Sequence, residues 1–473
     1  MKTLEPDICV IGAGSAGLSI AAGASQMGAQ TVLIEKGEMG GDCLNYGCVP
    51  SKALLVAGRA AQAWRQTAAF GIDSPEPTVD FPRVHAHVRD VIDGIAPLDS
   101  VERFTGLGVD VIKDKAVFQD GRTLVADGAR IRAKRFVVAT GSRASIPPIE
   151  GLDQVAYLTN ETVFSLTERP EHLIVIGGGP IGSELGQAFR HLGAEVSLVE
   201  MGSILQNDDP ELAEVVRRRF VEDGIRLYEQ AKVSRVAAAG NGVAVTLELA
   251  GGEQRIEGSH LLLAAGRQPT VEGLGLEAAG IDYDRRGIKT DARLRTSNKR
   301  VYAAGDVAGG PQFTHMAGHH AGVVIKNALF RLPAKVETKA VPWVTYTEPE
   351  LAHVGLTEAM ARTAGHQITI LRWDFHENDR ARAERQTEGL CKAVITPKGK
   401  ILGASIVGPQ AGELIQPWVL AMSNGLKISA MAQVIAPYPT LGEVSKRAAG
   451  SFYTPKLFGE RTKKLVRFLL RLP

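Results

Sequence analysis

Short apolar runs that lead into glycine and then into a helical pattern occur twice in the first half of the chain. The first begins at Ile8 and continues through a glycine-rich turn into a helical stretch that ends near Gln26. The second begins at Leu173 and repeats the pattern. Apolar runs of this length that end in glycine are typical of buried strands. The pattern therefore predicts two strand-turn-helix units of an α/β protein.

The glycine spacing in the first turn predicts dinucleotide binding. Gly12 permits a tight turn, Gly14 lets the backbone approach a pyrophosphate, and Gly17 lets the helix pack on the strand. The N–H groups at the start of the helix would face the phosphate charge. The next strand pattern, 31–35, ends in Glu35, where a ribose hydroxyl would be held.

The second unit repeats both features. Its turn carries Gly177, Gly179 and Gly182, and its next strand pattern ends in Glu200. Two complete copies argue against a chance match. Glu200 would accept a hydrogen bond from a free 2′-hydroxyl and repel a 2′-phosphate, and no Arg directly follows it. The sequence therefore favours NADH, with NADPH as the alternative.

Length and composition set the class of protein. A chain of 473 residues exceeds the size of one hydrophobic core, which predicts two to four domains. Lys and Arg number 54 against 52 Asp and Glu, so no strong field recruits nucleic acid. Four cysteines are too few for a stapled secreted scaffold, and neither a signal-peptide pattern nor an apolar run of roughly 20 residues is present. We expect a soluble, cytoplasmic protein without a nucleic-acid partner.

Two of the cysteines, Cys43 and Cys48, lie close together before the helical run 53–63. Cys48 is near the start of that helix, where N–H groups and the positive end of the helix dipole stabilise a thiolate. Lys52, one turn later, adds positive charge. We therefore expect the pKa of the Cys48 thiol to be lowered.

A structural disulfide, half of a zinc site, and two buried thiols are the alternatives to a redox role. A disulfide over so short a loop would add only about 2 kcal/mol by loop entropy, which matters little to a chain with this much core. Zinc would require further Cys or His at short spacing, and the chain has no second Cys pair. We favour a redox-active pair, since two nucleotide-binding units accompany it.

Motifs along nearly the whole chain resemble those of the pyridine nucleotide-disulfide oxidoreductases, the family of dihydrolipoamide dehydrogenase, glutathione reductase and mercuric reductase. The matching segments are 12–17, 43–52, 139–141, 264–267, 296–306 and 346–355. The resemblance implies an α/β fold with two Rossmann-like dinucleotide-binding domains and a C-terminal α+β dimerisation domain. The implied bounds are 1–148 and 271–340 for the FAD domain, 149–270 for the NAD(P) domain, and 341–473 for the interface domain of a homodimer.

The resemblance also implies a mechanism with FAD and NAD as cofactors. NADH delivers hydride to one flavin face, and the reduced flavin opens the Cys43–Cys48 disulfide on the other. Cys48 would be the charge-transfer thiolate beside the flavin, and Cys43 the outer thiol that exchanges with substrate. Lys52 should pair with Glu184 beside the flavin, and Asp306 should hold the ribityl region. No metal site is predicted. The residues assigned to the two cofactors are Gly12, Gly14, Gly17, Glu35, Thr140, Gly141, Gly305, Asp306, Gly177, Gly179, Gly182, Glu200, Gly266 and Arg267.

The chain departs from the family pattern at Tyr438. Relatives that act on small disulfides or dithiols have a histidine there, which the partner subunit contributes together with a glutamate as acid and base. Here the tyrosine replaces the histidine and Glu443 remains. A phenol with an ordinary pKa near 10 is a poor base at neutral pH. Mercuric reductases are similar in having Tyr, but they also carry a C-terminal Cys pair, and this chain has no Cys after Cys391.

We therefore expect a mercuric-reductase-like enzyme that passes electrons from NADH through FAD and the Cys43–Cys48 pair to a disulfide or a thiophilic metal ion, with its active site shared between two subunits. Three alternatives stay open: a dihydrolipoamide dehydrogenase-type dithiol oxidoreductase, a diaphorase or NADH oxidase with idle thiols, and a non-catalytic redox sensor.

Two further segments attract attention. His315, His319 and His320 follow the second FAD motif, but no nearby carboxylate or Cys completes a metal site, so we expect His315 to lie near flavin instead. The tail 456–473 has six basic residues against one acid, with large apolar residues interspersed. We expect it to pack as a helix on its own dimer, and a helix at a membrane surface is the alternative.

Overall fold

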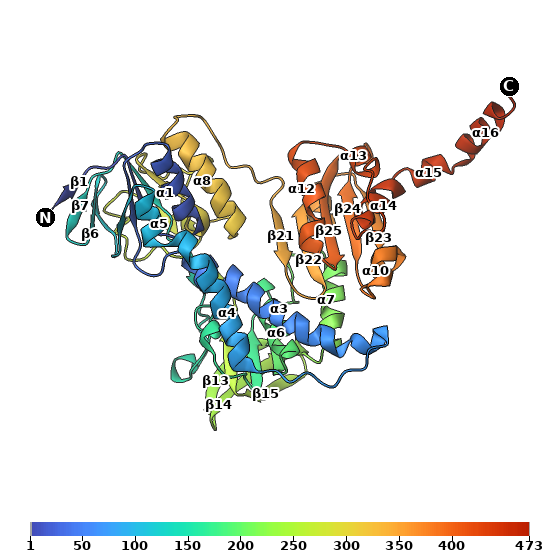
Figure 1. Ribbon diagram of the computed structural model, residues 1–473, viewed down its shortest axis with the longest axis horizontal. Helices are drawn as coiled ribbons and strands as arrows, with labels where there is room; N and C mark the ends of the chain where they lie inside the picture. Colours follow the sequence, from blue (N-terminus) through green and yellow to red (C-terminus); the bar gives the residue numbers. More distant parts are fainter. Residues whose placement is uncertain (1, 473) are drawn as a thin grey trace. The chain divides into compact units, whose positions relative to one another are not determined.

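The computed structural model describes residues 2–472 and divides into two compact units (Figure 1). The first comprises Met1–Met201 and Ala231–Glu337, and the second comprises Gly202–Gln230 and Thr338–Pro473. Both glycine turns and both close cysteines lie in the first unit. These units do not separate the FAD domain from the NAD(P) domain, so the predicted domain bounds stay a prediction.

A parallel sheet with the order β20-β8-β2-β3-β4 supports the first glycine turn. Helices α1 (Ser15–Gln26) and α8 (Thr314–Ala328) pack together on one of its faces (Figure 1). The central strands β2 and β3 are buried along their whole length, as expected for a sheet that is covered on both sides. Their bounds are β2 (Ile8–Ile11), β3 (Thr31–Ile34), β4 (Val109–Ile112), β8 (Arg135–Val138) and β20 (Val301–Ala303).

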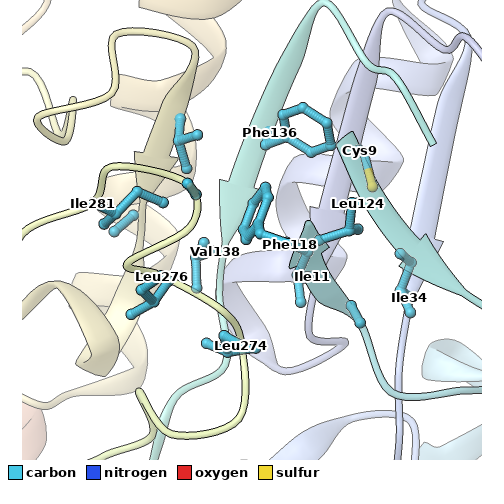
Figure 2. Packing of buried hydrophobic residues seen from close by; sticks show 14 of the residues in the cluster. Cys9, Ile11, Ile34, Phe118, Leu124, Phe136, Val138, Leu274, Leu276 and Ile281 are labelled. Carbon is cyan, nitrogen blue, oxygen red and sulfur yellow. The ribbon is translucent and has the colours of Figure 1, made fainter. Parts of the chain in front are cut away.

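The other face of this sheet forms a core with a mixed sheet of order β1-β7-β6-β5, in which β1 runs parallel to β7 and the other neighbours are antiparallel (Figure 2). Phe118 and Phe136 meet there edge to face, with ring centroids 5.3 Å apart. Cys9 is fully buried in the same core, and this burial raises the pKa of its thiol. Cys9 therefore acts as a small apolar residue. The strands are β1 (Thr3–Leu4), β5 (Val117–Asp120), β6 (Thr123–Ala126) and β7 (Ala129–Ile131).

A second parallel sheet in the same unit includes β11, β10 and β16 in that order and supports the second glycine turn. Its helix, α6, begins with Pro180, a residue suited to the first turn because no N–H is needed there. The bounds are β10 (His172–Ile176), α6 (Pro180–His191), β11 (Glu195–Val199) and β16 (His260–Leu263). An antiparallel meander of three strands belongs to the same part of the chain: β13 (Lys232–Ala239), β14 (Gly242–Leu249) and β15 (Gly252–Gly258).

Three further helices complete this part of the first unit: α3 (Cys48–Arg65), α4 (Phe81–Ile95) and α5 (Val101–Gly106). Helix α3 packs along α6, so the chain that follows Cys48 is held against the second nucleotide unit. A short antiparallel pair, β9 (Ser142–Ala144) with β17 (Arg267–Pro269), joins the two nucleotide units.

The second unit is an antiparallel sheet of order β21-β22-β25-β24-β23 with helices packed on it (Figure 1). Trp418 of α12 and Cys391 of β24 are fully buried in its core. The strands are β21 (Pro342–Thr345), β22 (Glu350–Gly355), β23 (Thr369–Asp374), β24 (Leu390–Ile395) and β25 (Ile401–Gly408), and the main helices are α7 (Pro210–Glu222), α12 (Gln416–Ser423), α13 (Ile428–Ala432) and α14 (Glu443–Ser451).

The observed architecture agrees with the predicted fold class. The first compact unit contains two parallel sheets that each support a glycine turn, and the C-terminal part of the chain is α+β. The chain ends with α15 (Thr454–Leu457) and α16 (Glu460–Leu469). No helix among residues 2–472 combines the length and the apolar composition needed to cross a membrane.

Candidate functional site

The two glycine turns have the same geometry. Gly12 and Gly177 have φ angles of +106° and +111°, and a Cβ at either would collide with a backbone carbonyl, that of Ala139 or Ala264. A Cβ at Gly17 or Gly182 would likewise collide with the carbonyl of the first glycine in its own turn. The glycines are therefore required by close backbone packing.

Two acids hold these turns from the neighbouring strands. Glu35 Oε2 accepts from Ala13 N at 2.6 Å, and Glu200 Oε2 accepts from Gly178 N at 2.7 Å. Each acid lies just after a strand and fixes the middle residue of its turn. Gly14 and Gly179 are the N-cap residues that precede α1 and α6, and neither helix has a side-chain cap. Uncapped N–H groups beside a glycine turn fit a dinucleotide pyrophosphate, so both turns are suited to the predicted cofactors.

Asp306 follows β20 at the same sheet edge as the first turn. Its Oδ2 accepts from Ser142 Oγ at 2.6 Å, and Arg267 Nε donates to Ser142 Oγ at 2.8 Å. Burial raises the pKa of Asp306, although Ser142 and Arg267 oppose the rise. A largely buried carboxylate at this edge is chemically suited to the hydroxyl groups of a flavin ribityl chain.

The other residues predicted for this edge shape its backbone. Thr140 Oγ1 donates to Thr270 O at 2.7 Å, and Gly141 has a φ of +67°. Gly305 and Gly266 also have positive φ, at +75° and +107°. These positions favour glycine because a Cβ would strain the left-handed backbone.

The cysteine pair lies on two consecutive helices. Cys43 is partly buried within α2 (Gly41–Asn45), and Cys48 is the first residue of α3 and is exposed. Gly47 joins the helices, and a Cβ there would come within 3.0 Å of the carbonyl oxygen of Asp42. The tight connection keeps the two sulfurs together, since Cys43 is close enough to donate a hydrogen bond to Cys48.

The electrostatics of the pair distinguish its members. The pKa of Cys48 is lowered, chiefly by the hydrogen bond from Cys43, and then by Thr314 and by the charge of Lys52. The pKa of Cys43 is raised, because its proton bonds to the Cys48 sulfur and because the thiol is partly buried. Cys48 is therefore the thiolate and Cys43 the thiol.

Lys52 contributes less than its position in the sequence suggests. Its Nζ lies 2.7 Å from Glu184 Oε2 of α6, in the pairing that the resemblance implies. The Glu184 side chain is only 7% exposed. Since the carboxylate neutralises most of the lysine charge, the neighbouring thiol supplies the main stabilisation of the Cys48 thiolate.

Sequence reasoning missed three contacts of this loop. The Sγ of Cys48 lies 3.4 Å from the hydroxyl of Thr314, at the start of α8. Asp42 Oδ1 accepts from Asn160 Nδ2 at 2.9 Å and lies 3.2 Å from Arg267 Nη2. In the sequence, the acid directly before Cys43 was the only residue that could have suggested these contacts, and it does not indicate which residues it would bind.

Tyr438 and Glu443 lie in the second unit, whereas the cysteines lie in the first. The Tyr438 side chain is 69% exposed, and its hydroxyl donates to Asp379 Oδ2 at 2.9 Å. This hydrogen bond raises the pKa of the phenol further, so an even smaller fraction of Tyr438 is in the phenolate form that could act as a base. Glu443 begins α14 and lies 3.9 Å from Arg447. Their predicted role across a dimer interface stays a prediction.

The histidines after the second FAD motif have separate partners. His320 Nδ1 accepts from Gly305 N at 3.1 Å, and burial lowers its pKa to about 4. His319 Nε2 accepts from Glu337 N at 3.2 Å, and the His315 ring stacks on Phe313. Among residues 2–472, no group of three or more His, Cys, Asp or Glu side chains is arranged to hold a metal ion.

Two dinucleotide turns beside a pair of thiols, joined to an α+β unit, define an FAD-dependent oxidoreductase that uses a nicotinamide cofactor. The pyridine nucleotide-disulphide oxidoreductase profile matches residues 6–321, and the dimerisation domain of that family matches residues 341–449. The chain belongs to the pyridine nucleotide-disulfide oxidoreductase family. Members of this family bind FAD and use NAD(P)H, and the dimerisation domain supports a homodimer.

Curated relatives carry two different names. Mercuric reductase from Streptomyces lividans is 36% identical over 460 residues, which cover 94% of this chain and 96% of the relative. Dihydrolipoyl dehydrogenase from Bacillus subtilis is also 36% identical, with the same coverage. Among solved structures, the HOCl-induced flavoprotein disulfide reductase RclA from Escherichia coli, described as a Cu(II) complex, matches with a TM-score of 0.84 and 28% identity over 93% of this chain and 98% of that chain.

Proposed function

We propose that the protein carries electrons from NADH through FAD to the Cys43–Cys48 pair and on to a thiophilic metal ion, with small disulfides as the second acceptor class. The observation that carries the proposal is the placement of the pair: Cys48 is exposed at the start of α3 with its Sγ 3.4 Å from the Thr314 hydroxyl, and Cys43 lies on the preceding helix α2. FAD, when bound at the first glycine turn, supplies the two-electron link between nicotinamide and sulfur.

The protonation of the pair favours a metal ion over a disulfide. To attack a disulfide, Cys43 must lose its proton, yet its pKa is raised and Tyr438 is a poor base. A thiophilic cation binds both sulfurs as thiolates and displaces that proton itself, so no separate base is needed. The Cu(II) complex described for RclA supports this acceptor class by analogy.

Reduction of an acceptor disulfide by this pair is also a balanced reaction. The Cys43 thiolate attacks one sulfur of the acceptor and releases a thiolate, and Cys48 then attacks the Cys43 sulfur and releases the second. The pair leaves the reaction as a disulfide, and the acceptor gains two electrons and two protons, one from Cys43 and one from solvent. The dihydrolipoyl dehydrogenase relatives support this dithiol chemistry as the second candidate.

Other functional assignments belong to the same proposal. We propose that Lys52 and Glu184 flank the flavin, that Tyr438 and Glu443 approach the thiols from the partner subunit, and that NADH is preferred because of Glu200. We also propose an FAD domain at 1–148 and 271–340, an NAD(P) domain at 149–270, and an interface domain at 341–473.

The deciding experiment is an anaerobic acceptor screen with NADH and NADPH side by side, using mercury, copper and gold ions, glutathione disulfide, lipoamide and quinones. With metal ions, we expect Cys43→Ser and Cys48→Ser to lose at least about a hundredfold in turnover, while Cys391→Ala, a cysteine buried elsewhere, retains it. Cys48→Ser should also lose the long-wavelength charge-transfer absorbance. Undiminished turnover of Cys43→Ser on every acceptor would identify a diaphorase instead.

The tyrosine argument has its own test. Because a positioned base contributes about a hundredfold or more, Tyr438→His should raise turnover with glutathione disulfide or lipoamide and leave metal-ion turnover nearly unchanged. Tyr438→Phe is the control and should give no gain. If Tyr438→His changed turnover equally with metal ions and with disulfides, this result would contradict the proposal that only disulfide reduction needs a separate base.

A further inference from the structure

The C-terminal tail, defined as residues 456–472, has no buried side chain. Helices α15 and α16 contain no buried residue, and Figure 1 shows them leading away from the sheet of the second unit. Eight large apolar side chains of the tail are between 46% and 79% exposed. They are Leu457, Phe458, Leu465, Val466, Phe468, Leu469, Leu470 and Leu472. So much exposed apolar surface on one short segment marks an interaction surface.

The tail is amphipathic along α16 and the turn that continues it. Leu465, Phe468, Leu469 and Leu472 have the spacing i, i+3, i+4 and i+7, which places them on one face. Lys464, Arg467 and Arg471 form a second row along the helix, and Lys463 lies beside this row. Glu460 is the only acid of the tail and pairs with Lys463 at 2.9 Å.

Charge separates the tail from the rest of the chain. The tail has six basic residues and one acid, which leaves 48 basic and 51 acidic residues elsewhere. We propose that the tail is an interfacial helix that binds the surface of anionic lipid bilayers, with its leucine and phenylalanine face among the acyl chains and its basic rows on the lipid phosphates. Arg461, in the first turn, has a stem long enough to reach the phosphate layer.

A second copy of the chain fits this surface less well. The matched dimerisation domain ends at residue 449, before the tail begins. Two tails that paired through their apolar faces would bring two strongly basic segments together, and their charges would repel. An anionic bilayer supplies an apolar layer and negative charge at once, which is the combination that the tail complements.

The test is flotation of the intact, FAD-loaded protein with vesicles of phosphatidylcholine alone or phosphatidylcholine with phosphatidylglycerol. We expect binding only to the anionic vesicles, weakened by salt, and a loss of at least about tenfold on truncation after Phe458. Changing Lys463, Lys464, Arg467 and Arg471 to Gln, or Leu465, Phe468 and Leu469 to Ser, should each give a comparable loss. Flavin absorbance and NADH oxidation in solution should stay unchanged, which shows that the variants are folded.

A matched control removes exposed apolar side chains elsewhere. Phe330→Ser with Leu332→Ser changes two residues that are 55% and 53% exposed outside the tail, and it should not alter flotation. Equal partitioning of intact and truncated protein would overturn the proposal. So would an apolar-face variant that dissociates the dimer without changing vesicle binding, because the tail would then cover a second copy of the chain.

Discussion

The sulfur of Cys48 lies 3.4 Å from the hydroxyl oxygen of Thr314, a residue 266 positions further along the chain. Thr314 begins α8, and α8 packs on α1, the helix that starts at the first glycine turn. The packing of α8 on α1 therefore places the Thr314 hydroxyl at the Cys48 thiolate, and it also brings the first glycine turn, which suits a pyrophosphate, into the same region. Donation to the charged sulfur is one cause of the lowered pKa of Cys48.

Removing this donor should raise the pKa of Cys48. A hydrogen bond to a charged group contributes about 1.5 kcal/mol or more, which corresponds to a rise of about one pKa unit for Thr314→Val. The measurement is a pH titration of the thiolate absorbance in the reduced enzyme. Thr314→Ser keeps a hydroxyl and should titrate like the wild type. An unchanged titration of Thr314→Val would show that Thr314 does not contribute to the lowered pKa of Cys48.

The pairing of Lys52 with Glu184 makes a separate prediction about stability. Glu184 is nearly buried, so Lys52→Met removes its nearest cation and should lower the free energy of unfolding by about 2 kcal/mol, a value reduced from that of a fully buried pair because Lys52 is 37% exposed. The double variant Lys52→Met with Glu184→Gln should recover part of this loss. Denaturant unfolding of the FAD-loaded protein measures both. A double variant less stable than the single one would contradict the ion-pair explanation.

The features that sequence predicts correctly are those set by neighbouring residues. A Cβ at Gly17 or Gly182 would collide with the first glycine of the same turn, and α3 starts at Cys48 directly after Gly47. The sequence also predicted a lowered pKa for Cys48, but it assigned the cause to the helix start and to Lys52. The leading cause is the hydrogen bond from Cys43. That contact depends on how two short helices turn relative to each other.

Contacts between distant segments could not be predicted in the same way. Asp42 meets Arg267, and Cys48 meets Thr314, only after strands far apart in sequence have joined one sheet or pair. The segment Gly202–Gln230 is a further example, because it groups with residues after 338. Lys392, whose side chain is 4% exposed, lies 2.8 Å from Asp209 and 3.0 Å from Glu211 and ties this segment to β24. No periodicity along the chain encodes such an ion pair.

A buried histidine should make stability depend on pH. His353 is 1% exposed, and burial lowers its pKa from 6.5 to about 4. Between these values the unfolded chain binds a proton that the folded chain excludes, so the stabilising contribution is complete above about pH 6.5 and is lost as the pH falls toward 4. The loss is about 3 kcal/mol. His320 has a similar lowered pKa and adds to the slope.

Denaturant midpoints measured from pH 7 to pH 4 test this expectation. His353→Gln should flatten the slope, and His320 and His260 should keep part of it because burial lowers their pKa values too. His376→Gln is the matched control, since that side chain is 60% exposed and should leave the slope unchanged. Parallel slopes for the His353→Gln variant and the wild type would refute a role for this side chain.

Glu200 offers the sharpest test of nicotinamide choice, because its charge and its hydrogen bond can be separated. Its Oε2 accepts from Gly178 N at 2.7 Å, and a glutamine keeps an acceptor oxygen for that bond while losing the negative charge. If repulsion of a 2′-phosphate sets the preference, Glu200→Gln should narrow the NADH-to-NADPH ratio of kcat/KM by about tenfold, chiefly through a lower KM for NADPH. Glu195→Gln, at the exposed start of the same strand, controls for loss of one negative charge. Should both variants change the ratio equally, the effect would come from net charge, and the position of Glu200 after β11 would not explain cofactor preference.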